Sequence, residues 1–242
     1  MDRIEESVNA WPPNGLPATL ADRTRRVYDR MAAVYPVSTM LFHSRAHRCA
    51  LEASGIADGM RVLEVATGSG EMFRRLVKAN AGGSTIGVDL SPNMAARTQR
   101  AARRKFPQAR THCQAVDARH MPFRGEAFDA VFCCYMLELL STEDIGRALR
   151  EFRRVLAPGG ILVLGTPDYG RLAWRITERV YGALVPGGYA DEHITRYTRR
   201  SLAAELAAAG FEILEYRYVG AGELILRCRS GAGGNQAPDS GG

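Results

Sequence analysis

Two glycines and a carboxylate within Arg61–Met72 have the types and spacing of a ligand-binding turn. An apolar run with Glu64 near its end leads into the small residues 66–70, and a helix-like segment follows. Because Gly68 and Gly70 have no Cβ, they can adopt positive φ and let a flat polar molecule lie against the backbone. The pattern predicts a strand, a tight turn that touches a ligand, and a helix.

Further binding groups stand at the ends of later strand-like runs. Asp89 ends one run, where a carboxylate can accept hydrogen bonds from both hydroxyls of a ribose. Asp117 follows the next run and is placed to accept from an adenine amine, while Ala118 offers a backbone N–H; an Asx turn is the alternative role for Asp117. At Cys134-Tyr135-Met136 an apolar or aromatic side chain can cover the base. This layout is typical of a nucleotide-type cofactor site.

Alternating strands and helices must bring these residues together. Ser91-Pro92 and Ser141–Asp144 have the residue types of helix starts. We expect one or two helices over 20–54, broken near Pro36, and a turn from helix into strand at Pro158–Gly160. The further predicted strands lie near 61–66, 84–89, 110–115, 128–134, 160–165, 211–219 and 222–229, and the helices near 70–79, 91–105, 143–156, 169–184 and 198–209.

Strand–helix alternation implies a mostly parallel sheet that is covered on both faces, with the ligand across the C-terminal ends of the strands. Only residues 220–222 separate the last two strands, so these must pair antiparallel. We therefore expect an α/β fold: a seven-stranded, mostly parallel, doubly wound sheet that ends in an antiparallel β-hairpin.

Two cofactor classes fit the glycine turn. Dinucleotide-binding proteins typically carry G-x-G-x-x-G, but Phe73 stands where the third glycine belongs. An NAD-dependent oxidoreductase is also disfavoured because neither Lys78 nor Lys105 has a tyrosine four residues before it. It stays an alternative, as does a non-catalytic protein that binds the cofactor and works through a partner.

Five segments together resemble the motifs of class I S-adenosylmethionine-dependent methyltransferases. They are Leu63–Gly70, Gly87–Met94, Asp117–Phe123, Phe128–Phe132 and Arg154–Gly160, and the likeness covers about residues 25–229. Within the class the chain is most similar to the ubiquinone/menaquinone C-methyltransferases, through Val27–Tyr35 with His47-Arg48, and through residues 209–212 and 220–223. The resemblance implies a Rossmann-like methyltransferase fold and S-adenosylmethionine as cofactor.

The resemblance also implies roles for single residues. Glu64 would orient the glycine turn and contact the methionine ammonium group, with a solvated strand-end acid as the alternative. The expected cofactor contacts are Glu64, Ala66, Thr67, Gly68, Gly70, Asp89, Leu90, Met94, Asp117, Ala118, Cys134 and Tyr135.

The acceptor side departs from the quinone enzymes. Met136–Leu139 stands where they carry Gly-Leu-Arg-Asn, and the insert between strands five and six is short. We therefore expect only a small, lipophilic acceptor: a quinol carbon, an aminophospholipid nitrogen or a small-molecule hydroxyl. Tyr28 and Tyr35 are candidates for a lid, or else pack an amphipathic helix. His193 is the candidate general base, with a surface histidine as the alternative. Methyl transfer depends mainly on alignment, so it needs no obvious catalytic residue.

Composition bounds the remaining possibilities. The chain has 242 residues, 46% of them apolar, and no apolar run of eighteen, so we expect a cytoplasmic protein without a transmembrane helix. We expect a flexible arm over 1–19, one methyltransferase domain over 20–229 and a disordered tail over 230–242.

The five cysteines show no metal-ligand spacing, which predicts no metal site. The net charge of +6 comes from arginines spread over several helices, so no specific nucleic acid is expected, while peripheral membrane contact and the oligomeric state stay open.

Overall fold

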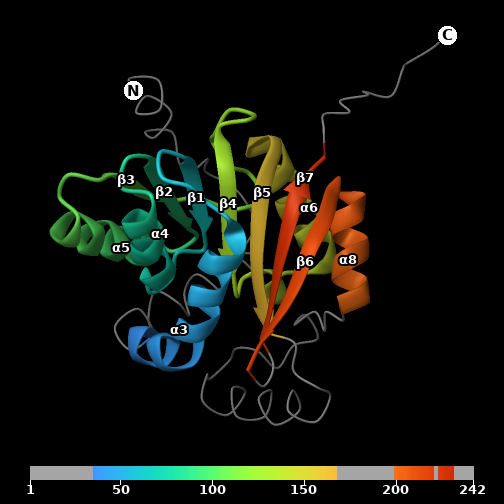
Figure 1. The fold of residues 1–242 in the computed structure, drawn as a ribbon, viewed down its shortest axis with the longest axis horizontal. Helices are drawn as coiled ribbons and strands as arrows, with labels where there is room; N and C mark the ends of the chain where they lie inside the picture. Colours follow the sequence, from blue (N-terminus) through green and yellow to red (C-terminus); the bar gives the residue numbers. More distant parts are fainter. Residues whose placement is uncertain (1–34, 168–198, 221–222, 232–242) are drawn as a thin grey trace, which may run out of the picture.

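A computed structural model describes residues 35–167, 199–220 and 223–231 of the chain. These residues form one seven-stranded sheet in the order β3-β2-β1-β4-β5-β7-β6, shown in Figure 1. The first five strands in the chain are parallel, and β7 runs antiparallel to both of its neighbours. This confirms the predicted fold, including the terminal hairpin. The strands are β1 (Arg61–Val65), β2 (Ser84–Asp89), β3 (Arg110–Ala115), β4 (Phe128–Cys134), β5 (Leu156–Pro167), β6 (Phe211–Val219) and β7 (Glu223–Ser230).

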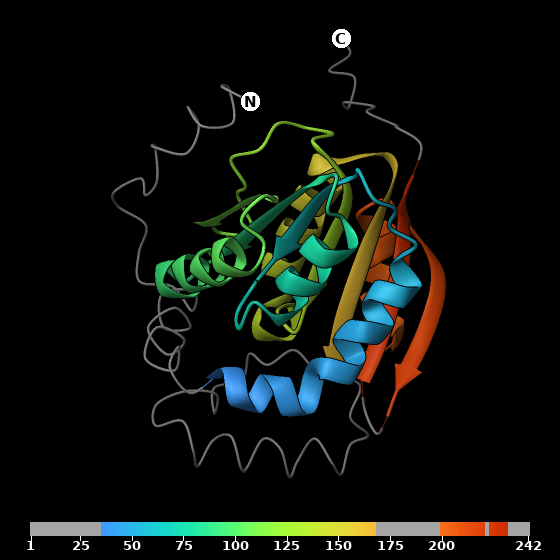
Figure 2. The ribbon, with the colours of Figure 1, turned by 60° about the vertical axis from the view of Figure 1, so that its left-hand side comes forward.

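Helices cover both faces of the sheet (Figures 1 and 2). One buried apolar cluster joins α3 and α4 to one face, and a second joins α6 and α8 to the other face. The predicted caps are present: Ser91 accepts from the Met94 N–H at the start of α5, and Ser141 accepts from the Asp144 N–H at the start of α6. The helices are α3 (Tyr35–Ser54), α4 (Glu71–Ala79), α5 (Pro92–Lys105), α6 (Thr142–Val155) and α8 (Arg199–Ala208), with a 3₁₀ turn, η2, at Leu137–Leu139.

One predicted boundary was wrong. Strand β5 begins at Leu156, so Pro158–Gly160 lies inside the strand and does not turn into it. The pairing of β4 with β5 shifts register there, from Phe128 opposite Leu156 to Ala130 opposite Ile161. An irregularity of this kind lets a sheet absorb a proline and glycines without ending the strand.

The break predicted near Pro36 falls at the edge of the described residues, since α3 is described from Tyr35 onward. The rest of the predicted helical stretch, residues 20–34, lies outside the described residues. So do the predicted helix 169–184, the arm 1–19 and the tail from residue 232 onward.

Candidate cofactor site

The turn after β1 takes the predicted backbone conformation. Gly68 and Gly70 have φ of 47° and 72°, and Ala66 also has a positive φ of 63°. The turn is closed by hydrogen bonds from the Gly70 N–H to the Thr67 carbonyl (2.7 Å) and from the Thr67 N–H to the Val88 carbonyl (3.2 Å). It is therefore a compact bend tied to the neighbouring strand β2.

Gly70 is required for packing as well as for its φ. A Cβ built there would lie 2.7 Å from Oγ1 of Thr98, a buried residue of α5. The absence of a side chain lets the start of α4 approach α5. Gly70 and Thr67 do not line the pocket that the turn borders, so the structure places them behind its wall.

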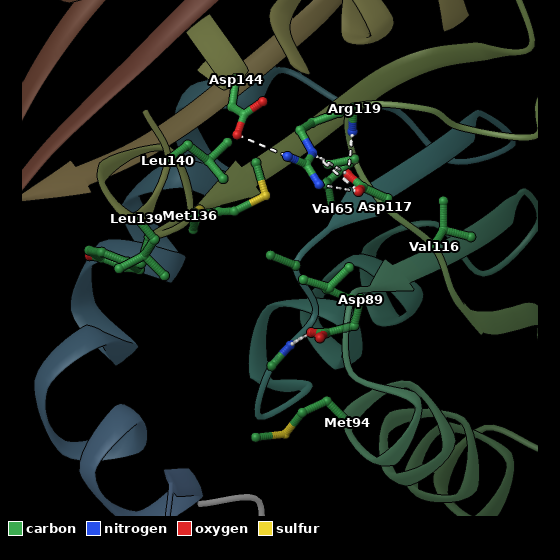
Figure 3. A pocket seen from close by; sticks show the side chains of 16 residues that line it. Val65, Asp89, Met94, Val116, Asp117, Arg119, Met136, Leu139, Leu140 and Asp144 are labelled. Carbon is green, nitrogen blue, oxygen red and sulfur yellow. Dashed lines mark hydrogen bonds and ion pairs between the residues drawn. The ribbon is translucent and has the colours of Figure 1, made fainter. Parts of the chain in front are cut away.

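Asp89 lies at the C-terminal tip of β2 and faces the pocket (Figure 3). One carboxylate oxygen accepts from the Gly68 N–H at 2.8 Å, and the other accepts from the Ser91 N–H at 2.9 Å. A carboxylate can accept about four hydrogen bonds in all, so this anchoring is compatible with contacts to two ribose hydroxyls. Asp89 thus links the glycine turn to the start of α5 at the pocket edge.

The pocket runs along the C-terminal ends of the strands. Nine of the predicted cofactor residues line it, namely Ala66, Gly68, Asp89, Leu90, Met94, Asp117, Ala118, Cys134 and Tyr135. Met136 and Leu139, from the stretch expected on the acceptor side, also line it, whereas sequence reasoning missed Val65, Val116, Arg119, Leu140 and Asp144. Figure 3 shows Asp89 and Met94 on one side, and Met136, Leu139 and Leu140 along another. The site therefore combines carboxylates with an apolar slot.

Glu64 is buried beneath the turn and does not line the pocket. Its Oε2 has no hydrogen-bond partner among the described residues. Burial raises the pKa of Glu64 well above its ordinary value, and the Asp89 carboxylate raises it further. A buried acid without a partner is costly, and a nearby ammonium group would offset that cost.

Arg119 links Asp117 to Asp144 at the wall of the pocket (Figure 3). Its guanidinium binds both oxygens of Asp117 and lies 2.9 Å from Oδ2 of Asp144, in the first turn of α6. The Asp117 side chain also accepts from the Arg119 N–H, which is the Asx turn considered as the alternative. Burial alone would raise the pKa of Asp117, but the hydrogen bonds from Arg119 outweigh it and hold this pKa below its ordinary value. Asp117 is thus held ionised at the pocket wall.

The remaining predicted acceptor residues are not placed. Tyr28 and His193 lie outside the described residues, and of Tyr35 only the backbone, at the start of α3, is described. No helix in the described part of the chain is long and apolar enough to cross a membrane. Within the same residues, no cluster of three or more histidine, cysteine or acidic side chains could hold a metal ion.

These residues fit S-adenosylmethionine. The bend presents small residues at the pocket edge, and Asp89 beside it keeps acceptor capacity for the hydroxyls of a ribose. The apolar residues Val116 and Ala118 can flank a base, and Oε2 of the buried Glu64 has no partner among the described residues. The individual contacts to the cofactor stay predictions.

Comparison with known proteins agrees with this site. Residues 62–160, from β1 into β5, match the family described as "Methyltransferase domain". A demethylmenaquinone methyltransferase of Thermus thermophilus is 33% identical over 168 residues, which are 63% of this chain and 74% of that protein.

Two further similarities extend the comparison. A malonyl-[acyl-carrier protein] O-methyltransferase of Geobacter sulfurreducens is 33% identical over 68% of this chain, but the match spans only 60% of that protein. Among solved structures, the [4+2]-cyclase SpnF superposes with a TM-score of 0.72 at 21% identity, covering 91% of this chain and all of that one, which supports the fold alone. The alternative of an NAD-dependent oxidoreductase is therefore set aside: the chain belongs to the class I S-adenosylmethionine-dependent methyltransferases.

Proposed function

We propose that the chain transfers the methyl group of S-adenosylmethionine to a small, lipophilic acceptor, with a quinol as the first candidate. The observation that carries this proposal is the composition of the pocket. Carboxylates and the glycine turn occupy one side, and the side chains of Met136, Leu139 and Leu140 occupy another. An apolar wall favours a ring or chain over a polar acceptor.

The names of the relatives also bear on the class of acceptor. The Thermus relative is named for demethylmenaquinone and the Geobacter relative for a malonyl thioester carrier, so both names point to acceptors other than nucleic acid. The stretch Met136–Leu139 is more apolar than the Gly-Leu-Arg-Asn expected for quinone enzymes. A quinol carbon is therefore tested beside an aminophospholipid nitrogen and the malonyl group of an acyl-carrier protein.

The protein's contribution to the reaction is mainly alignment. When bound, the cofactor supplies an activated methyl group on a sulfonium centre. Asp89 and the turn would hold the adenosine part, the apolar wall would orient the acceptor, and closure of the site would exclude water. Correct orientation of the reactants can supply roughly 7–11 kcal/mol of rate acceleration.

Product formation tests the acceptor. The protein is incubated with S-adenosylmethionine and either reduced demethylmenaquinone, phosphatidylethanolamine vesicles or malonyl-acyl-carrier protein, and S-adenosylhomocysteine and the methylated product are measured. We expect turnover with the quinol. Turnover only with the vesicles or only with the carrier protein would contradict the quinol assignment.

Replacement of Asp89 tests the cofactor site. Asp89→Ala removes the acid expected to accept from the ribose and frees the Gly68 N–H, so S-adenosylmethionine affinity should fall at least about 100-fold, on the order of 3 kcal/mol. Calorimetric titration gives the affinity. The matched control is Asp129→Ala, which removes an Asp–Arg61 ion pair at the opposite end of β1 and should leave affinity unchanged. An Asp89→Ala affinity within about threefold of the parent, on the order of 0.6 kcal/mol, would show that the ribose assignment is wrong.

A further inference from the structure

A histidine and a glutamate from opposite ends of the described chain meet beside the cofactor pocket. His43 lies on α3 and Glu223 begins β7, two elements that pack against each other. Nδ1 of His43 is 2.9 Å from Oε1 of Glu223, and both side chains are largely buried. A carboxylate on Nδ1 holds an imidazole in one orientation, with Nδ1 as donor and Nε2 as acceptor.

Tyr135 joins this pair to the pocket. Its hydroxyl donates to the same Glu223 oxygen at 2.7 Å, and its ring centroid lies 3.9 Å from that of His43. Tyr135 also lines the pocket, so it connects the His43–Glu223 pair to the pocket wall. The backbone of Tyr135 has a φ of 59°, an uncommon conformation for a large residue, and its N–H is held by the Gly165 carbonyl at 2.8 Å. Such strain is typical of functional positions.

Tyr135, Glu223 and His43 have different hydrogen-bonding roles. Burial, followed by the charges of Cys134 and Glu223, raises the pKa of Tyr135 far above its ordinary value, so its hydroxyl stays protonated and serves as a donor. Glu223 already accepts from both neighbours. The Nε2 atom of His43 is the acceptor that this arrangement leaves for a proton.

A second histidine nearby has a different setting. His47, one turn along α3, is only 5% exposed and has its Nδ1 3.4 Å from Oε2 of Glu71. Burial would raise the pKa of Glu71, but hydrogen bonds from His47, Arg75 and Ser44 lower it to about 2. The charged groups packed around His43 are thus Glu223 of β7 and, beyond His47, the Glu71–Arg75 pair of α4. Of the two imidazoles, His43 has the shorter bond to a carboxylate and the more exposed side chain.

We propose that His43 is the general base of this site and accepts a proton from an acidic hydroxyl of the acceptor, with Glu223 as the residue that positions it. This inference rests on the proposed function. The acceptor O–H bond breaks, its proton moves to Nε2 of His43, and its electron pair stays on the acceptor. For methylation on oxygen, that electron pair forms the bond to the methyl carbon. For methylation on carbon, it forms the C=O bond while a ring π pair bonds to the methyl carbon; the ring carbon then releases its proton to water, and the oxygen recovers the proton from His43. In both cases the sulfur keeps the pair of the bond that breaks.

The proposal specifies the acceptor class. A base is useful only where the acceptor must lose a proton at the reacting stage, as a phenol or hydroquinone does, and it then contributes typically 10²–10⁴-fold. A phosphatidylethanolamine ammonium must also lose a proton, so the base alone does not separate the two classes of acceptor. The dyad and the apolar wall of Met136, Leu139 and Leu140 together favour a phenolic acceptor, methylated on oxygen or on the ring carbon that ionisation activates.

Ionisation of a bound phenol tests the base without requiring turnover. The probe is 4-nitrophenol, whose ionised form is yellow, added at about pH 6 to protein saturated with S-adenosylhomocysteine. We expect the probe to bind and its nitrophenolate absorption to increase at least tenfold over the free probe. His43→Gln should bind the probe within about threefold of the parent affinity but lose this increase, and Glu223→Gln should reduce it.

Controls separate the possible failures. His112→Gln removes an imidazole from β3, at the opposite edge of the sheet, and should keep the full absorption increase. A melting curve and S-adenosylhomocysteine affinity show whether His43→Gln is folded; if it is not, His43→Asn replaces it. In addition, a low-field proton resonance from Nδ1–H of His43 should be present in the parent and absent in Glu223→Gln.

Three outcomes would overturn the inference: ionisation of the probe by the His43 variants as in the parent, no binding of 4-nitrophenol, or no such resonance. Failure of the proposed function looks different: the parent protein would then give product only with the vesicles or only with the carrier protein, which is measured by product formation and not by the probe. Binding of the cofactor without ionisation of the probe leaves the methyltransferase assignment intact and removes only the role of His43.

Discussion

Asp89 and Asp117, the acids at the C-terminal strand ends, accept hydrogen bonds from nearby backbone N–H groups. The Asp89 carboxylate accepts from the turn and from the start of α5, and the Asp117 carboxylate accepts from the loop that follows it. Each acid is therefore oriented before a cofactor arrives. Preorganisation of this kind lowers the cost of ordering side chains on binding.

Gly70→Ala should destabilise the protein by about 2–3 kcal/mol. The alanine would have to keep a φ of 72°, and its Cβ would lie 2.7 Å from Oγ1 of Thr98. The left-handed conformation costs roughly 1–2 kcal/mol, and the steric overlap adds to it. The measurement is the urea midpoint and slope.

A double-mutant cycle separates these two causes. Thr98→Ala removes the hydroxyl that the new Cβ would meet, and this hydroxyl has no partner among the described residues. In the Thr98→Ala background, Gly70→Ala should cost about 1 kcal/mol less than in the parent. Equal costs in both backgrounds would show that close packing of α4 on α5 is not the reason for this glycine.

The sequence predicted those parts of the site whose signal is local. A carboxylate at a strand tip or a glycine pair after an apolar run is visible in a few residues, so the turn, Asp89 and Asp117 could be anticipated. Arg119 lies within a recognised motif, yet its partner Asp144 is 25 residues away on α6. Pairs set by tertiary packing leave no local pattern, and the sequence analysis therefore missed this bridge.

At the scale of elements, Arg119 clamps the loop after β3 to the first turn of α6. Both of its ion pairs are largely buried, with side-chain exposures of 12% for Arg119 and 9% for Asp117. Arg119→Ala leaves the Asp117 carboxylate buried without its guanidinium, so the free energy of unfolding should fall by about 2–4 kcal/mol at pH 7. Chemical denaturation measures this loss.

The effect should depend on pH in a defined direction. The pKa of Asp117 is lowered in the folded state, so the ion pair contributes stability above the unfolded pKa of the acid, and this is lost as pH falls through the folded value. The cost of Arg119→Ala should therefore shrink in acid. Arg229→Ala, at an exposed pair with Glu212 on the β6–β7 hairpin, is the control and should cost less than about 0.5 kcal/mol. Equal losses for the two variants would contradict the clamp.

The start of strand β5 could not be predicted from the local sequence. Pro158 and two glycines are typical of a turn, and the strand beyond them was predicted from residue 160. In the folded chain the neighbouring strand β4 continues to pair across a shift in register, so the strand begins at Leu156. Tertiary pairing overrode the local turn preference.

At the scale of the whole molecule, the first and last described elements complete the site. Buried alanines of α3, at positions 46, 50 and 53, pack in one cluster with residues of β5 and β7, and small side chains permit a close approach. That approach brings His43 within reach of Glu223, 180 residues away in the chain. Local patterns could not predict this pair, because it exists only when both ends of the domain have docked.

Buried acids also couple the stability of the whole domain to pH. Glu138 of η2 is buried, its Oε2 has no partner among the described residues, and burial raises its pKa to about 8. The folded state therefore keeps a proton that the unfolded chain loses above about pH 4.5. Stability from this group is full below the unfolded pKa and falls as pH rises toward 8, and the raised pKa of Glu64 acts in the same direction.

Glu138→Gln should flatten this dependence. The amide stays neutral at every pH, so the decline in unfolding free energy between about pH 5 and 8 should become shallower, from an upper bound of about 1.4 kcal/mol per pH unit for the acid. Urea titrations at several pH values measure the slope in parent and variant. Glu143→Gln, at an exposed position in the first turn of α6, is the matched control and should leave the slope unchanged. A Glu138→Gln slope as steep as that of the parent would mean that Glu138 is ionised in the folded protein, and that its burial is relieved by a group that binds its charge.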